Sequence, residues 1–181
     1  VNFDGTLFFT KLNQLWKSDG TAAGTEMIFA SDSSDTARPR ELTVVDGTLY
    51  FTADDGVDGR ELWKTDGTAA GTVQVKDIRP GADGSLVGVL EAVGTTLYFQ
   101  ADDGVHGSEL WKSDGSAAGT VMVIDIVAGS GNSNPRELTD VGGTLFFAVN
   151  DGTNGDELWS SDGTAAGTNL VKDIFSGSGG S

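Results

Sequence analysis

The sequence has 181 residues, 38% of them hydrophobic, so the chain is long enough to bury a core of its own. Its 27 acidic and 11 basic residues give a formal net charge of −16. This balance argues against binding to nucleic acid or to an anionic membrane surface, because both need clustered Lys or Arg. Membrane insertion is not expected either, because no apolar run approaches the roughly 18 residues of a membrane-spanning helix. The absence of cysteine excludes disulfides and thiolate metal sites.

Four tryptophans divide the chain into repeats. Trp16, Trp63, Trp111 and Trp159 follow one another at intervals of 47, 48 and 48 residues. Around them the chain reads QLWKSDGTAAGT, ELWKTDGTAAGT, ELWKSDGSAAGT and ELWSSDGTAAGT. A regular period of this length is typical of one supersecondary unit that stacks on copies of itself.

Each repeat is predicted to contain four short strands that form an antiparallel meander. Asp46-Gly47 and Gly142-Gly143 predict tight two-residue hairpins between the first and second strands, because both turn positions need a positive φ. The third strand carries the Leu-Trp pair. The predicted bounds are 41–45 and 137–141 for the first strand, 48–53, 96–101 and 144–149 for the second, and 73–78 and 121–126 for the fourth.

The strands do not alternate between apolar and polar residues. The run 145–149 reads LFFAV and the run 121–124 reads VMVI, whereas a sheet with one wet face alternates. Both faces of each sheet must therefore be covered, and radial stacking of identical four-stranded sheets does this. We therefore predict an all-β fold, a β-propeller of four-stranded antiparallel blades in four tandem repeats of about 48 residues. An open solenoid and two β-sandwiches are the alternatives.

The repeats predict a single repeat domain over 1–181, with blades at approximately 1–31, 41–78, 88–126 and 137–175. Val1 aligns with Thr43, and Ser181 aligns with Ser85 and Ser133, so both ends fall at the same phase of the repeat. Either four blades close on themselves or the chain is a segment of a longer ring or filament. An unclosed stack would leave an apolar blade face exposed at each end.

The blocks ELWKTDGT and ELWKSDGS resemble those of bacterial proteins named for ELWxxDGT repeats, and the resemblance covers essentially the whole chain. The first repeat departs from the pattern with Gln14 in place of the Glu at 61, 109 and 157. The resemblance implies a secreted or surface-exposed repeat protein of poorly defined activity, and it does not imply a catalytic site. The strand layout also resembles kelch blades, and the Asp-Gly turn is similar to the Asp-box of sialidase-type propellers, without the trailing aromatic residue of that box.

The loop between the second and third strands is the most suggestive polar feature. It reads ADDGVDGRE, ADDGVHGSE and VNDGTNGDE in the last three repeats, and clustered carboxylates at short spacing are ligands that calcium prefers. The competing interpretation is a solvated turn in which Asp and Gly satisfy the backbone. The candidate metal ligands are Asp54, Asp55, Asp58, Asp102, Asp103, Asn150, Asp151 and Asp156.

Other residues favour structural roles. His106 is the only histidine, and it occupies a turn position that Asp58 and Asn154 fill in other repeats. The Trp residues are expected to anchor the blades, with the indole N–H bonded to a backbone group. The Glu before each Leu-Trp pair is expected to make an inter-blade hydrogen bond or ion pair, and the Thr hydroxyls of the TAAGT loops are expected to bond nearby backbone.

The sequence therefore predicts a non-enzymatic, extracellular or cell-surface structural or adhesive module of bacterial origin, in which repeated weak contacts add up. Its expected partners are other copies of itself, through ring closure or assembly, or a surface glycan or protein. The alternative is a calcium-dependent, lectin-like propeller that binds glycans. An enzyme would need one repeat to break the symmetry with distinctive catalytic residues, and no repeat does so.

Overall fold

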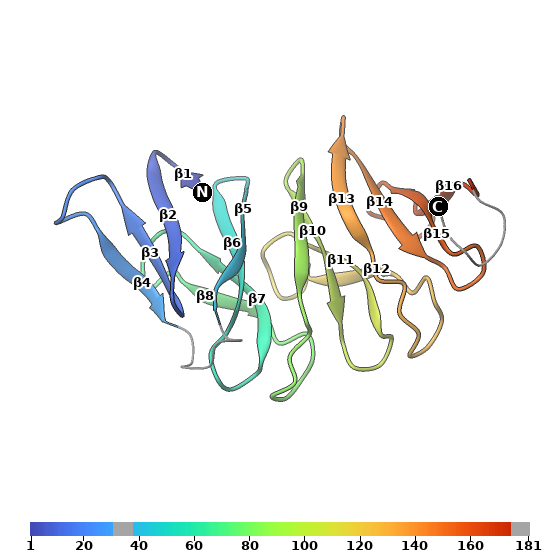
Figure 1. Ribbon diagram of the computed structural model, residues 1–181, viewed down its shortest axis with the longest axis horizontal. Helices are drawn as coiled ribbons and strands as arrows, with labels where there is room; N and C mark the ends of the chain where they lie inside the picture. Colours follow the sequence, from blue (N-terminus) through green and yellow to red (C-terminus); the bar gives the residue numbers. More distant parts are fainter. Residues whose placement is uncertain (31–37, 175–181) are drawn as a thin grey trace. The chain divides into compact units, whose positions relative to one another are not determined.

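The computed structural model describes residues 1–30 and 38–174, and these residues form four separate antiparallel sheets of four strands each. In every sheet the strands are neighbours in chain order, so each sheet is a meander, as the hairpin signals predicted (Figure 1). The described residues contain no helix, and therefore none that is long and apolar enough to cross a membrane.

The chain divides into two compact units, Val1–Val87 and Gly88–Ser181, and each unit contains two of the sheets. In the first unit, blade 1 consists of β1 (Asn2–Phe3), β2 (Thr6–Lys11), β3 (Gln14–Ser18) and β4 (Glu26–Ala30), and blade 2 consists of β5 (Arg40–Val45), β6 (Thr48–Asp54), β7 (Arg60–Thr65) and β8 (Val73–Lys76). In the second unit, blade 3 consists of β9 (Gly88–Val93), β10 (Thr96–Asp102), β11 (Ser108–Ser113) and β12 (Val121–Ile124), and blade 4 consists of β13 (Arg136–Val141), β14 (Thr144–Asn150), β15 (Asp156–Ser161) and β16 (Asn169–Lys172).

The predicted hairpins are confirmed. Asp46 and Gly47 have φ values of 45° and 70°, and Gly142 and Gly143 have φ values of 62° and 89°. These turns pair the strands in the register Val45↔Thr48 and Val141↔Thr144. The predicted strand bounds agree with the structure to within one or two residues. The ends of the predicted first and fourth blades, residues 31 and 175, lie outside the described residues.

The fourth strand of each repeat ends earlier than predicted. β8 ends at Lys76 rather than at Ile78, and β12 ends at Ile124 rather than at Ile126. The reason is that the backbone N–H of Ile78 donates to the side chain of Glu61, and that of Ile126 donates to Glu109. These N–H groups therefore donate to a carboxylate and not to a neighbouring strand.

Within the first unit the two blades pack face to face through one apolar cluster. Blade 1 contributes Phe3, Phe8, Leu15 and Ile28, and blade 2 contributes Leu49, Phe51, Ala53 and Trp63. The rings of Phe29 and Trp63 lie 4.8 Å apart, and those of Phe29 and Phe51 lie 5.5 Å apart in an edge-on arrangement. Side chains from alternate positions of β6 thus face the preceding blade.

The second unit repeats this interface. Blade 3 contributes Val93, Tyr98, Leu110 and Val123, and blade 4 contributes Leu138, Leu145, Phe147 and Val149. The prediction that both faces of the aromatic strands are covered is confirmed for β10, where the neighbours Tyr98 and Phe99 are both buried. It is wrong for β14, because Leu145, Phe147 and Val149 are buried but Phe146 and Ala148 between them are only half-buried.

Two of the tryptophans are buried anchors, but the expected backbone partner of the indole N–H is wrong for Trp16, Trp63 and Trp159. Trp63 and Trp111 are buried, whereas Trp16 and Trp159 are half-buried. Trp16 Nε1 donates to a side chain, Gln14 Oε1, at 3.0 Å, and Nε1 of Trp63 and Trp159 has no partner among the described residues. In those repeats the residue two positions before Trp is a Glu whose carboxylate is bonded elsewhere.

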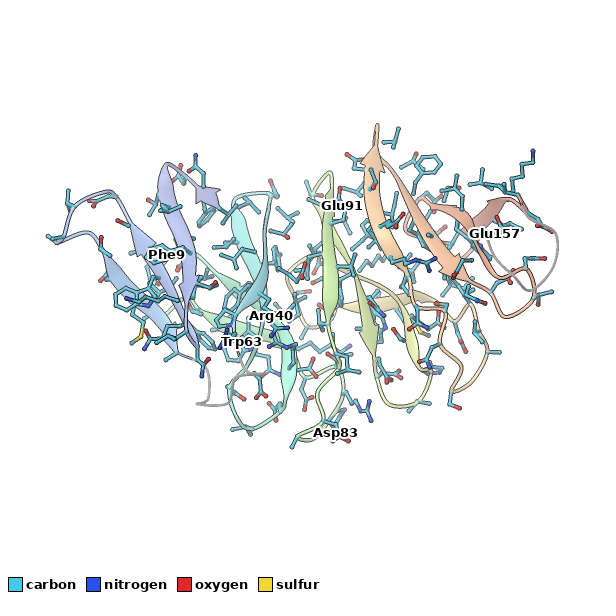
Figure 2. The ribbon with its side chains drawn as sticks, viewed as in Figure 1. Phe9, Arg40, Trp63, Asp83, Glu91 and Glu157 are labelled. Carbon is cyan, nitrogen blue, oxygen red and sulfur yellow. The ribbon has the colours of Figure 1, made fainter. Side chains whose placement is uncertain are left out.

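We expect Trp63→Ala to lower the free energy of unfolding by about 3–5 kcal/mol, because it leaves a large cavity beside Phe29 and Phe51 (Figure 2). The matched variant Trp16→Ala should cost clearly less, because Trp16 lies on a face that is only half-buried. Chemical denaturation of both variants measures the difference. Equal losses would mean that Trp63 does not anchor the interface between blades 1 and 2.

Candidate functional site

The Asp-Gly-Thr motif of each repeat builds one turn. In blade 2, Asp66 Oδ1 accepts hydrogen bonds from the backbone N–H and the hydroxyl of Thr68, at 2.8 and 2.7 Å. Thr68 Oγ1 accepts from the N–H of Gly71 at 2.9 Å, and the Thr72 hydroxyl donates to the carbonyl of Thr68 at 2.7 Å. A Cβ on Gly71 would overlap the Asp66 carboxylate, so only glycine is accommodated there. The hydrogen bonds from Thr68 also lower the pKa of Asp66.

The same bonds recur in the other three repeats, around Asp19, Asp114 and Asp162. The prediction that the Thr hydroxyls close this turn on the backbone is therefore confirmed. The most conspicuous polar residues of the motif form its scaffold, and Oδ1 of each Asp is engaged within the turn.

A lysine joins neighbouring blades within each unit. Lys17 Nζ of blade 1 donates to the carbonyl of Gly67 in blade 2 at 2.8 Å, and Lys112 of blade 3 bonds Gly163 of blade 4 at the same distance. An aromatic ring lies against each of these glycines: an added Cβ would lie 3.2 Å from the Phe8 ring at Gly67 and would overlap the Tyr98 hydroxyl at Gly163.

The Glu before each Leu-Trp pair is a buried acceptor for the segment that leaves the blade. Glu61 is fully buried, and its carboxylate accepts from the backbone N–H groups of Ile78, Arg79 and Ser85 at 2.9–3.2 Å. The Ser85 hydroxyl donates a further bond at 2.6 Å. This carboxylate therefore accepts hydrogen bonds from both ends of the linker that follows blade 2.

Glu109 makes the same contacts in blade 3, with Ile126, Val127 and Ser133. Glu157 in blade 4 accepts from the N–H of Ile174, and Ser181, which aligns with Ser133, lies outside the described residues. The predicted inter-blade hydrogen bond or ion pair of this Glu is wrong in its partner, because Glu61 and Glu109 bond the linker that follows their own blade. Burial raises the pKa of Glu61 to about 7 and raises that of Glu109 as well, against the opposing effect of the hydrogen bonds that each carboxylate accepts.

In the loops predicted to bind calcium, the polar side chains accept hydrogen bonds from the backbone of the same loop. The side chains of Asp54, Asp102 and Asn150 each accept from the N–H two residues on, at 2.7–2.8 Å. Those of Asp55, Asp103 and Asp151 each accept from two successive N–H groups. Asp156 bonds Arg136 at 2.9 Å, and Asp58 lies near Asp77. Among residues 1–30 and 38–174, no group of three or more acidic or histidine side chains is placed to hold a metal ion.

His106 has the role of a turn residue. Its Nδ1 lies 2.7 Å from Asp103 Oδ2, and this contact raises the pKa of His106. In blade 4 the amide of Asn154 donates to Asp151 Oδ2 at the same distance, so the two side chains are interchangeable here. An arrangement that accepts either His or Asn does not depend on proton transfer.

The loop packs against the linker. A Cβ on Gly59 would overlap backbone atoms of Ala82 and Gly84, and the N–H of Ser85 donates to the carbonyl of Arg60 at 3.0 Å. Blade 1 lacks the loop, and it also has Gln14 in place of Glu and, by alignment, Ala37 in place of Ser. The loop, the Glu and the Ser are therefore present together or absent together.

One recurring acid was missed by the sequence analysis. Asp77, Asp125 and Asp173 follow the fourth strand of blades 2 to 4, where the repeated Asp-Ile pair was a signal that could have been used. Burial, followed by the charge of Asp58, raises the pKa of Asp77. Oδ1 of Asp125 and of Asp173 is buried without a hydrogen-bond partner among the described residues.

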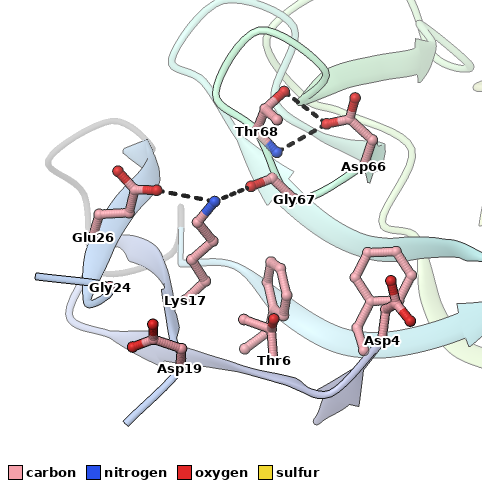
Figure 3. Close-up of a pocket in the computed structure, with 11 residues that line it drawn as sticks. Asp4, Thr6, Lys17, Asp19, Gly24, Glu26, Asp66, Gly67 and Thr68 are labelled. Carbon is pink, nitrogen blue, oxygen red and sulfur yellow. Dashed lines mark hydrogen bonds and ion pairs between the residues drawn. The ribbon is translucent and has the colours of Figure 1, made fainter. Parts of the chain in front are cut away.

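A cavity of about 400 Å³ lies between the turns of blades 1 and 2 (Figure 3). Lys17 is the basic residue of its lining, and its Nζ bonds Glu26 at 2.9 Å as well as Gly67. The rest of the lining includes two phenylalanine rings and the acidic side chains of Asp4, Asp19 and Asp66. Lys17 is thus held in place by protein groups, and the cavity offers mainly acceptor oxygens to a ligand.

Three solved structures resemble this chain at low sequence identity. Puromycin hydrolase matches with a TM-score of 0.60 at 16% identity over 92% of this chain, a prolyl endopeptidase with 0.57 at 12% over 93%, and a puromycin-hydrolyzing peptidase of Mycobacterium tuberculosis with 0.55 at 11% over 96%. The chain spans 26–32% of the length of these proteins. No protein-family model and no curated protein matches the sequence. The likeness shows the fold: the four antiparallel sheets are β-propeller blades.

The raised pKa of Glu61 predicts how stability depends on pH. Because the folded protein holds this proton up to about pH 7 and the unfolded chain releases it near the ordinary value of 4.5, the contribution of Glu61 to stability should fall as pH rises between these values and stay constant above them. The loss should not exceed about 3 kcal/mol. The difference in free energy of unfolding between the wild type and Glu61→Gln, measured across this range, should therefore shrink with pH. A constant difference would mean that Glu61 is ionised throughout.

Calcium binding by the loops stays a prediction. If the loops bind the ion, calcium added to chelator-treated protein should raise the melting temperature in a concentration-dependent way, because binding to the folded state stabilises it. Asp103→Asn together with Asp151→Asn should reduce the shift. Titration without heat and without a change in melting temperature would remove calcium from consideration.

Proposed function

We propose that the chain is a non-enzymatic structural or adhesive module that works outside the cell, by presenting repeated blades to partners. The observation that carries this proposal is that the polar motif residues are bonded within the protein itself. The Asp and Thr of each turn, and Glu61 and Glu109 with their linker serines, are bonded to the protein's own backbone and to each other. The recurring polar chemistry therefore serves to repeat one surface several times.

Repetition suits weak binding. Several equivalent contacts on one body raise the overall avidity by their effective concentration, without a deep pocket. The net charge of −16 favours solubility at high local density and disfavours anionic partners. The resemblance to bacterial ELWxxDGT-repeat proteins supports the extracellular or cell-surface location.

A calcium-dependent glycan-binding propeller is the second candidate. The observation in its favour is the proximity of Asp58 and Asp77, which is close enough for the charge of one to raise the pKa of the other. A cation between two such carboxylates would relieve their repulsion. The equivalent pairs in blades 3 and 4 are His106 with Asp125 and Asn154 with Asp173, so the site would be strongest in blade 2.

Beads that carry many copies of the chain test the proposal. We expect them to adhere to a surface coated with the same chain or to spots of a glycan array, with retention that rises steeply with the density of copies. The chain should hydrolyse none of a panel of fluorogenic aminoacyl and glycosyl substrates. Adhesion that disappears with a chelator would favour the glycan-binding candidate. Absence of adhesion at any density, or turnover that is retained through purification, would overturn the proposal.

A further inference from the structure

The outer face of blade 1 carries the same repeat positions as the face of blade 2 that is buried in the first unit. Leu7 corresponds to Leu49, and Phe9 corresponds to Phe51. Leu49 and Phe51 are fully buried against blade 1, but Leu7 is 52% exposed. Phe9, which is labelled in Figure 2, is half-buried. Met27 on the same face is 45% exposed. Blade 1 thus presents, uncovered, a surface that blade 2 uses to receive its neighbour.

The outer face of blade 4 is the complementary surface. In blade 3, Leu110, Val93 and Val123 are buried in the cluster shared with blade 4. Their counterparts in blade 4 are more exposed: Leu158 is 37% exposed, Val141 58% and Val171 48%. A concavity of about 420 Å³, lined in part by Phe146, Ala148 and Leu158, opens on this face.

The glycine of the Asp-Gly turn shows the same difference between blades that have a neighbour and blade 1. Gly67 and Gly163 each have an aromatic ring of the preceding blade against them, from Phe8 and Tyr98. Gly20 occupies this position in blade 1 with a similar φ of 91°, yet an added Cβ there would meet no described atom within 4 Å. The ring at the matching position of blade 4 is Phe146.

We propose that the outer face of blade 4 binds the outer face of blade 1 of a second copy of this chain, head to tail. The contact reproduces the interface between blades that each unit contains, with Leu158 packed on Leu7 and Phe9 and with Phe146 over Gly20. Because the two faces differ, the contact is heterologous, and it generates a ring or a filament. This inference rests on the proposed function and names the partner.

One residue difference between the repeats weakens this contact relative to the contacts between blades within each unit. Blade 4 has Ser160 where Lys17 and Lys112 donate to the glycine carbonyl of the next blade. The charge of −16 on each copy also opposes association, and salt screens this repulsion. The assembly is therefore reversible, strengthened by salt, and improved by restoring the lysine.

Sedimentation velocity over a range of protein concentrations tests the proposal. The wild type should form assemblies larger than a dimer, whereas Leu7→Asp and Leu158→Asp should each weaken association by at least about tenfold. An equimolar mixture of the two variants should form a one-to-one dimer and nothing larger, because each supplies the intact face that the other lacks. Ser160→Lys should strengthen the assembly. Val105→Asp, at a 63% exposed loop position, adds the same charge and should change nothing.

Three results would overturn the proposal. A wild type that stays monomeric at every concentration would mean that the two faces meet within one chain or stay unused. Self-association of Leu158→Asp alone would indicate a symmetric contact, and an unchanged assembly in both Asp variants would place the contact elsewhere. If beads carrying Leu7→Asp and Leu158→Asp still adhere, the adhesive function stands and this interface fails; if wild-type beads do not adhere, the proposed function itself fails.

Discussion

The buried carboxylate of the repeated Glu is the interaction on which the path of the chain out of blades 2 and 3 depends. The linkers that follow blades 2 and 3 leave the fourth strand with backbone N–H groups that donate to Glu61 or Glu109, and the serine before the next blade donates to the same carboxylate. A buried carboxylate without such donors would be strongly destabilising. The loop that packs on the linker, the Glu and the linker Ser are consequently one structural feature, and the sequence of blade 1 lacks all three.

This arrangement explains why the motif is so regular. Asp66 and Thr68 hold a turn, Glu61 holds a linker and Lys17 joins two blades, so each recurring residue satisfies a backbone group of the fold. In the proposed function, the repetition presents Asp-Gly-Thr turns that recur on each blade and apolar faces that a further blade would cover. Both are suited to weak contacts that gain strength by number.

The similarity to propellers of hydrolases concerns the blades alone. At 11–16% identity the shared feature is the four-stranded antiparallel blade of a β-propeller. The present chain aligns with about a quarter to a third of such proteins.

The sequence by itself determined the repeat, the meander and the hairpin turns, because Trp spacing and Asp-Gly or Gly-Gly pairs act locally along the chain. It also indicated buried apolar strands. Only the tertiary structure decided that Glu61 accepts linker N–H groups seventeen or more residues away, that the loop carboxylates cap their own turns, and that Leu7 and Leu158 are exposed while Leu49 and Leu110 are buried. Identical motifs carry no signal for which copy has a neighbour, since burial depends on what packs against a face and not on its residues.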